Sequence, residues 1–148
     1  MDDILNEQSW EDTDVTDNWY ENYPTDSLPS PFQTEACLTL NDEFLYVSFV
    51  CYDDETPDIV STLRRYFKYW LNDYISIIFS PYNDKLNGYF LNVTPWDAQR
   101  EGTVVNGGFG NSIFNTYWDN KWFSEAVRYE DKWIVEMAIP FKIYQYYN

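Results

Sequence analysis

Histidine is absent from the sequence of 148 residues. Its absence excludes a histidine general base, a Ser-His triad, and zinc or haem held by imidazole. No nucleophile motif, phosphate-binding loop or zinc-ligand spacing is present either. We therefore predict that the protein is not an enzyme and binds no haem and no nucleotide. Catalysis of glycoside hydrolysis by a pair of carboxylates is not excluded by composition, because 25 acidic residues supply such pairs throughout the chain.

Basic residues are also scarce. Nine Lys and Arg stand against 25 Asp and Glu, which gives a formal net charge of −16. Nucleic acids and anionic membranes are bound by clustered Lys and Arg, so we expect no nucleic-acid partner and no membrane insertion. No apolar run approaches the roughly 20 residues that span a bilayer. Met1-Asp2-Asp3 is acidic where a signal peptide has its basic region, so no signal peptide is visible.

Aromatic residues, by contrast, are abundant. Ten Phe, seven Trp and 14 Tyr make up 21% of the chain, which is more than a small core holds. Tyr and Trp combine an apolar body with a polar tip, so we expect some of these rings on the surface or along a groove. A tyrosine-rich strand surface is the plainer interpretation.

The length is that of one domain, and short apolar segments separated by turn signals predict an all-β, antiparallel β-sandwich. We assign residues 1–148 to this single domain, with 1–33 as an irregular, proline-containing N-terminal segment. The segment 94–110 is expected to be a loop with at most a short strand at 103–105. The predicted hairpins join 34–40 to 44–52, 74–79 to 89–93, and 125–129 to 132–139.

The first hairpin has a self-consistent register. If Leu40 pairs with Leu45, one face is apolar throughout and holds Ala36, Leu38, Leu40, Leu45, Val47, Phe49 and Cys51. The same register puts Cys37 opposite Ser48 and on the other face from Cys51. A disulfide needs Cβ vectors that converge, so we predict two free thiols.

The second hairpin holds the most apolar strand. Tyr74–Phe79 is a short run rich in isoleucine and aromatics, bounded by Asp73 and Pro81, which predicts a strand buried on both faces. Asn87-Gly88 is predicted to form the turn that follows, because both residues tolerate positive φ.

Four segments carry a resemblance to a known family. They are Asp3-Ile4-Leu5-Asn6-Glu7…Trp10, Thr34-Glu35-Ala36…Leu45-Tyr46-Val47…Asp53, Asn72-Asp73…Asn83-Asp84…Gly88-Tyr89…Asn92, and Trp118…Trp122…Ala126…Trp133…Glu136-Met137-Ala138-Ile139-Pro140-Phe141. In this order they resemble carbohydrate-binding module family 9, a DOMON-like fold, in the form of the N-terminal domain of Bacteroidetes-type outer-membrane proteins. The resemblance implies a non-catalytic module that binds a glycan or oligosaccharide. It also implies a bacterial, extracytoplasmic location within a larger secreted or outer-membrane protein, with a C-terminal barrel or enzyme domain as partner.

The resemblance also implies a sugar site. Trp70 of Trp70-x-x-Asp73 matches the first of two tryptophans that clamp a sugar. Ser76 stands where the sugar-binding members have an acidic contact residue. The second clamp tryptophan belongs to a final strand that lies beyond this sequence, so Trp96 and Trp118 are candidates to replace it.

Asn72 and Arg100 complete the predicted carbohydrate-binding set, because Asn72 is polar and close to Trp70 and because Arg donates to hydroxyls and stacks on rings. The alternatives are a structural Trp70 at the end of the sandwich and an Arg100 paired with surplus carboxylates. The departure at Ser76 and the missing strand favour a second function, a structural or protein-interaction domain without a sugar site.

Oxygen-bearing side chains at the strand ends suggest calcium, which takes oxygen ligands and supports loops in the family. The candidate metal ligands are Asp53, Asp73, Asn83 and Asp84. Asn83 and Asp84 are also good turn formers through side-chain bonds to the backbone. The alternative for Asp73 is a structural role in which its carboxylate accepts hydrogen bonds from turn N–H groups, and Asp53 also fits a solvated acidic rim.

Overall fold

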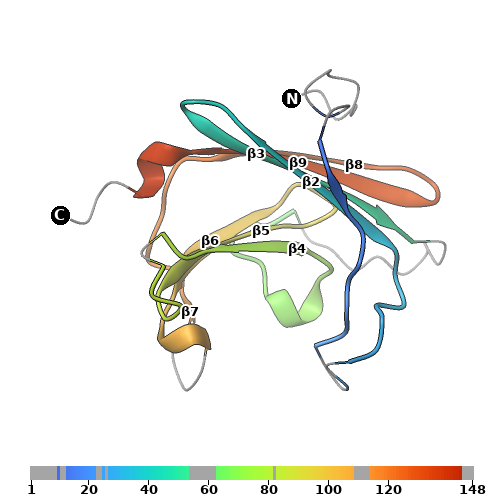
Figure 1. Ribbon diagram of the computed structural model, residues 1–148, viewed down its shortest axis with the longest axis horizontal. Helices are drawn as coiled ribbons and strands as arrows, with labels where there is room; N and C mark the ends of the chain where they lie inside the picture. The colour runs from blue at the N-terminus through green and yellow to red at the C-terminus, as the bar shows by residue number, and fades with distance from the viewer. Residues whose placement is uncertain are drawn as a thin grey trace.

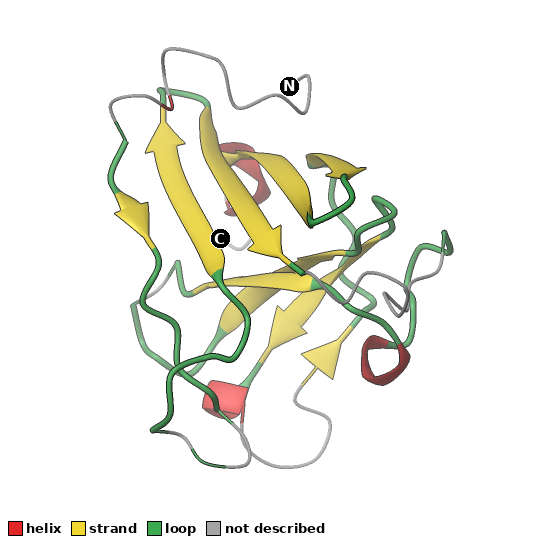
Figure 2. Ribbon diagram, turned by 90° about the vertical axis from the view of Figure 1, so that its right-hand side faces the viewer, coloured by secondary structure: helices red, strands yellow, loops and turns green. Residues whose placement is uncertain are grey.

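The computed structural model describes residues 10, 13–22, 25, 27–53, 63–81, 83–108 and 114–144. The segment Asp3–Glu7, which contributes to the family resemblance, lies outside them. The described residues form two antiparallel sheets in two layers (Figures 1 and 2), which confirms the predicted all-β sandwich. None of the helices in this part of the chain is both long and apolar enough to cross a membrane.

One layer has five strands and the other has four. The first contains, in spatial order, β1 (Val15–Thr16), β2 (Thr34–Leu40), β3 (Phe44–Tyr52), β9 (Lys132–Pro140) and β8 (Phe123–Arg128). The second contains β4 (Ile75–Phe79), β5 (Gly88–Val93), β6 (Gln99–Val104) and β7 (Phe114–Asn115). Three short 3₁₀ helices within the described ranges are η2 (Tyr69–Leu71), η3 (Asn106–Gly108) and η4 (Phe141–Tyr144).

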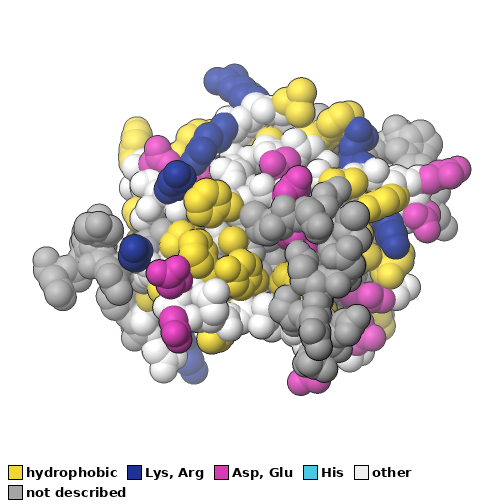
Figure 3. All heavy atoms as spheres, turned by 90° about the horizontal axis from the view of Figure 1, so that it is seen from above, with side chains coloured by type: hydrophobic (Ala, Val, Ile, Leu, Met, Phe, Trp, Pro, Cys, Tyr) yellow, Lys and Arg dark blue, Asp and Glu magenta, His cyan; other side chains and the backbone are white. Residues whose placement is uncertain are grey.

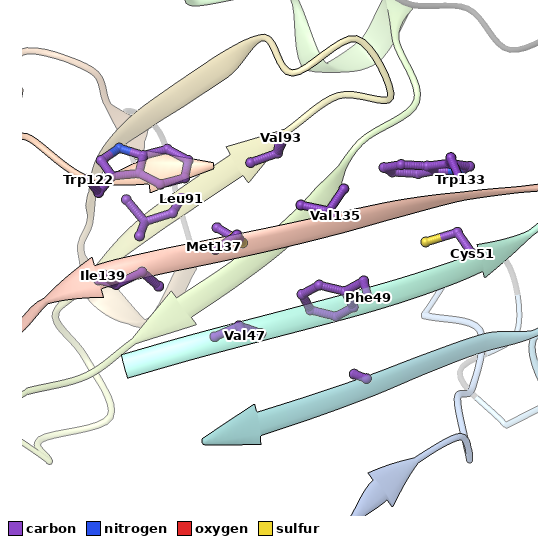
Figure 4. Close-up of a cluster of buried hydrophobic side chains, with 11 residues drawn as sticks. Val47, Phe49, Cys51, Leu91, Val93, Trp122, Trp133, Val135, Met137 and Ile139 are labelled. Carbon is purple, nitrogen blue, oxygen red and sulfur yellow. The ribbon is translucent and has the colours of Figure 1, made fainter. Parts of the chain in front are cut away.

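The core lies between the two layers. Alternate residues of β3 and β9 meet Leu91 and Val93 of β5, as Figure 4 shows. The buried cluster consists of Ala36, Val47, Phe49, Cys51, Leu91, Val93, Trp122, Trp133, Val135, Met137 and Ile139. Packing one face of each sheet against the other is how a sandwich buries its apolar strand faces.

The register of the first hairpin is the predicted one. Leu40 pairs with Leu45 and Cys37 with Ser48, and both cysteines are free thiols. Leu38 is on the predicted apolar face yet 50% exposed.

The N-terminal segment 1–33 is not wholly irregular. Val15 and Thr16 form β1 and pair with Cys37 and Ala36 at the edge of the five-stranded sheet. Two residues of strand fall below what a period-two pattern can indicate. The hairpin of β8 and β9 is confirmed, with Pro140 as the last residue of β9.

The burial predicted for β4 is wrong. This strand lies at the edge of its sheet, and Ile78 is 57% exposed. The strand buried on both faces is β5, which lies between β4 and β6. An apolar run therefore indicated a strand correctly but not its place in the sheet.

The turn that connects β4 to β5 also differs from the prediction. Its residues with positive φ are Asn83 and Lys85, whereas Gly88 is already the first residue of β5. A Cβ atom on Gly88 would lie 2.4 Å from the carbonyl oxygen of Phe79, so the glycine permits close approach of the two strands.

The segment 94–110 is not the expected loop. Residues Gln99–Val104 form β6, a full partner of β5. Its sequence is polar, with Arg100 and Glu101 in the middle, and this hid the strand from pattern analysis. This strand contributes to the candidate site described below.

Candidate functional site

The outer face of the four-stranded sheet carries the candidate site. Ile75 and Ile77 of β4 pack against the core, so Ser76 and Ile78 point to the opposite face. The helices η2 and η3 lie on this side, away from the five-stranded sheet (Figures 1 and 2). Tyr69 of η2 lines a recess over the middle of this face.

A row of polar side chains crosses this recess. Ser76 on β4 pairs with Asn92 on β5, and Asn92 pairs with Arg100 on β6. The Ser76 hydroxyl donates to Asn92 Oδ1 at 2.8 Å. Asn92 is buried, so the row forms a floor rather than a rim.

Aromatic rings stand around this floor and enclose a pocket of about 180 Å³. Its lining residues are Tyr69, Tyr74, Ser76, Ile78, Phe90, Asn92, Arg100 and Phe114. This volume is below the roughly 300–1,000 Å³ of pockets for drug-sized ligands, so it suits one small ring better than a large molecule.

The rings hold one another in place. Phe114 meets Phe90 edge-on, with centroids 5.3 Å apart, and it approaches Tyr69 at 6.4 Å. A Cβ atom on Gly102 would lie 2.7 Å from the Phe90 ring and 2.2 Å from the carbonyl oxygen of Asn115. The glycine in β6 therefore makes room for Phe90 and for β7 at this wall.

Arg100 lies within this ring cluster. Its guanidinium carbon is 4.9 Å from the centroid of Tyr69 and 5.2 Å from that of Phe90. Burial lowers the pKa of Arg100 from its ordinary value, and negative charge on Tyr74 and Tyr69 would raise it. The predicted alternative, a pairing of Arg100 with a carboxylate, is not found among the described residues.

A second recess of about 200 Å³ continues the first along the strands. The two share Ile78 and Phe114, and the second extends over Leu86 and Gly88 to Gly107 and Gly108. Its lining is mostly apolar. The outer face of the sheet thus carries a groove with one polar, ring-walled end.

No protein-family model, curated protein or solved structure matches this chain. Its function must therefore be argued from the chemistry of the groove.

Trp70 stands beside the polar end of the groove. Its ring is 63% exposed and meets the pocket-lining Tyr69 edge-on, with centroids 4.9 Å apart. The Asn72 amide donates to the carbonyl oxygen of Lys68 at 2.8 Å, which closes the chain around η2. The structure therefore brings Trp70, Asn72 and Arg100 into one region, with Tyr69 between Trp70 and Arg100.

Trp96 and Trp118 lie elsewhere. Trp118 packs against the core, and its ring centroid is 4.5 Å from that of Tyr89. The guanidinium of Arg128, at the end of β8, lies 3.2 Å from the centroid of Trp96. Neither tryptophan lines the pocket, whereas Phe114 lines it and also approaches Tyr69.

The predicted metal ligands are not brought together. Asp73 precedes β4, whereas Asn83 and Asp84 follow it, so the length of the strand separates them. Asp84 accepts hydrogen bonds from the backbone of Asn87 and Leu86, and these bonds lower the pKa of its carboxyl. Asp53 directly follows β3, which is a strand of the other sheet. Across the described ranges, no group of three or more acidic, Cys or His side chains is placed to hold a metal ion.

Most residues of the pocket wall were not predicted from the sequence. Tyr69, Tyr74, Phe90 and Phe114 come from four separate segments and differ little from the many other rings of this chain. A signal existed for Asn92, which is a polar residue in an otherwise apolar strand. Recognising Asn92 as a site residue required knowing that it pairs with Arg100, and therefore that residues Gln99–Val104 form the strand β6.

An ion pair between an exposed arginine and a buried carboxylate lies on the inner face of the same sheet. Glu101 is fully buried and accepts hydrogen bonds from Arg65 and from the Tyr66 hydroxyl, the latter at 3.0 Å. Arg65 also reaches Asp119 at 3.2 Å. Burial raises the pKa of Glu101, although its partners oppose this. The pair ties the segment before η2 to β6 and so supports the pocket from below.

Proposed function

We propose that this protein is a non-catalytic carbohydrate-binding module. The observation that carries the proposal is the ring-walled pocket with a polar floor on the outer face of the four-stranded sheet. A sugar has apolar C–H faces and polar hydroxyl edges. The aromatic walls suit the faces, and Ser76, Asn92 and Arg100 offer hydrogen-bond partners to the edges.

The family resemblance supports a sugar site at the same pocket. Trp70 matches a sugar-contact position of the family and contacts the pocket wall. Ser76 departs from the acidic residue of the binding members, but its position lines the same pocket. A module of this family belongs to a larger secreted or outer-membrane protein. We therefore extend the proposal to an extracytoplasmic location.

The lining chemistry supports binding without catalysis. Hydrolysis of a glycosidic bond uses two carboxyl groups on either side of the bond. The residues that line the pocket are rings, an isoleucine, a serine, an amide and an arginine.

A glycan titration tests the proposal. Mono- and disaccharides are added while tryptophan fluorescence is followed, with a Trp70→Phe variant to identify the reporting ring. We expect a saturable change that is lost or reduced in this variant, because Trp70 contacts the pocket wall. A flat response of the unmodified protein across the panel would overturn the proposal.

Wall variants locate the binding site. Tyr69→Ala removes a ring that contacts both Trp70 and Arg100, so we expect affinity to fall roughly fivefold or more. Tyr117→Ala is the matched control, because this ring is 95% exposed and does not line the pocket. Equal loss in both variants would argue against this pocket.

A protein-interaction domain is the second candidate function. It is favoured by the exposed apolar side chains of Ile78, Leu86 and Phe114 along the groove and by the position of β4 at the edge of the described sheet. Edge strands and apolar patches pair readily with other chains. A negative glycan panel together with concentration-dependent self-association in sedimentation would favour this function.

Calcium binding at the acidic loops stays a prediction. If Asp73, or Asn83 with Asp84, helps to hold calcium, then adding calcium should raise the melting temperature above that in sodium chloride of equal ionic strength. A chelator should reverse the effect. Equal melting temperatures in the two salts would contradict it.

A further inference from the structure

Arg100 differs from Arg65, which contacts the inner face of the same sheet. Arg65 forms ion pairs with Glu101 and Asp119, whereas no carboxylate of the described residues pairs with Arg100. What the structure does place against Arg100 are the faces of Tyr69 and Phe90. Rings satisfy the faces of a guanidinium, and they leave the N–H groups along its edge without acceptors.

An unpaired, half-buried guanidinium is costly to keep. It loses part of its hydration and gains no counter-charge, so such groups are normally paired. Carboxylate acceptors are plentiful in this chain, because acidic residues outnumber basic ones by 25 to 9. The polar end of the groove nevertheless presents a cation and no carboxylate.

The neighbouring amide adds donors of the same kind. Asn92 Oδ1 accepts the hydrogen bond from Ser76, so the amide N–H groups are left for another acceptor. Arg100 and Asn92 stand side by side on paired strands. The floor of the pocket is therefore rich in hydrogen-bond donors and positive in charge.

We propose that this pocket selects a sugar that bears a carboxylate, that is, a uronic acid. The inference rests on the proposed carbohydrate-binding function and specifies its ligand class. The carboxylate accepts from the edge of Arg100 and from the Asn92 amide, while the sugar ring lies against the aromatic wall that Tyr69 and Phe114 form together. A guanidinium matches the planar fork of a carboxylate, and one cation balances a monoanion. A phosphate dianion would bring a second charge to a protein of net charge −16, which disfavours it.

Calorimetric titration with D-glucuronate, D-glucose and glucose 6-sulfate tests the inference. We expect glucuronate to bind roughly 10- to 100-fold more tightly than glucose, the range that a charge-assisted hydrogen bond supplies. Arg100→Gln should abolish this preference and leave weak glucose binding. Arg100→Lys, which keeps the charge and loses the fork, should retain only part of it.

Lys121→Gln is the matched control, because it removes one positive charge outside the pocket lining and should leave the preference intact. Equal affinity for glucuronate and glucose would overturn the inference and leave the proposed function standing. A preference for the sulfated sugar would overturn the carboxylate assignment. Absence of binding to every sugar would overturn the proposed function itself, and the inference with it.

Discussion

Cys51 lies in the core, on the face of β3 that meets the second sheet, while Cys37 is half-buried on the opposite face of β2. Burial raises the pKa of the Cys51 thiol to about 12, although a hydrogen bond with Thr34 opposes this. Burial also raises the pKa of Cys37. Because the thiolate is the reactive form, both thiols should react slowly in the folded protein.

Alkylation followed by mass spectrometry checks this expectation. In the native protein at about pH 8, we expect no labelling of Cys51 and slow labelling of Cys37. After denaturation without reductant, both should label fully, because neither forms a disulfide. Fewer than two labels in the unfolded protein would show a bridge and contradict the register.

Glu101 gives the clearest pH prediction at the scale of one residue. Burial raises the pKa of its carboxyl above 4.5, so the folded state holds this proton at pH values where the unfolded state has lost it. The stability that Glu101 contributes is therefore greatest below the unfolded pKa. It falls as pH rises from there through the folded pKa and is constant beyond it.

The Glu101→Gln variant isolates this effect, because glutamine does not titrate. We expect the free energy of unfolding of the variant, relative to that of the unmodified protein, to increase with pH across the window above 4.5. Urea unfolding between about pH 4 and pH 8 measures it. A difference that is constant with pH, or that decreases, would refute the assignment.

At the scale of single strands, β2 and β3 show how far the four-stranded sheet covers the five-stranded one. Leu38 and Val47 are cross-strand partners on the same face, yet Leu38 is half exposed and Val47 is fully buried. The pairing of the two residues is set by the first hairpin alone, whereas their burial depends on packing against the four-stranded sheet. Two apolar residues at equivalent positions of the alternating pattern therefore contribute differently to the free energy of unfolding.

Paired alanine substitutions measure that difference. Val47→Ala removes buried methyl groups from the core and should lower the free energy of unfolding by about 2–3 kcal/mol. Leu38→Ala removes a larger side chain but should cost about 1 kcal/mol or less, because half of it is already in water. Denaturant unfolding of the two variants decides the matter. A cost at Leu38 equal to or above that at Val47 would show that a further surface covers this end of the sheet.

A comparison of the first hairpin with β6 explains which parts of the fold and of the site could be predicted from the sequence. Where a hairpin is local and one face is apolar, as in β2 with β3, pattern and turn specify the register. Where a strand carries an ion-paired Glu101 on its inner face and a ring-stacked Arg100 on its outer face, as in β6, polarity hides it. The candidate site depends on β6 and on rings from four segments. For this reason Trp70, Asn72 and Arg100 were predicted individually, and the pocket was not.

At the scale of the whole molecule, charge is the dominant property. Figure 3 views the five-stranded sheet from outside and shows acidic and basic side chains scattered among hydrophobic ones on the described part of this face. The chain as a whole nevertheless carries a formal charge of −16. Like charges held together in a compact state repel one another, and this self-repulsion lowers stability.

Salt should relieve this repulsion, because the Debye length falls from roughly 20 Å at 0.02 M to about 4 Å at 0.5 M. We therefore expect sodium chloride over this range to raise the melting temperature at pH 7 by about 2–5 °C. The control is the same comparison near the isoelectric point of about 4.1, where net charge and its repulsion vanish and the shift should disappear. A shift of equal size at both pH values would show that salt acts through apolar burial rather than through charge. A fall in melting temperature at pH 7 would show that local ion pairs, such as that of Arg65 with Glu101, outweigh the net repulsion.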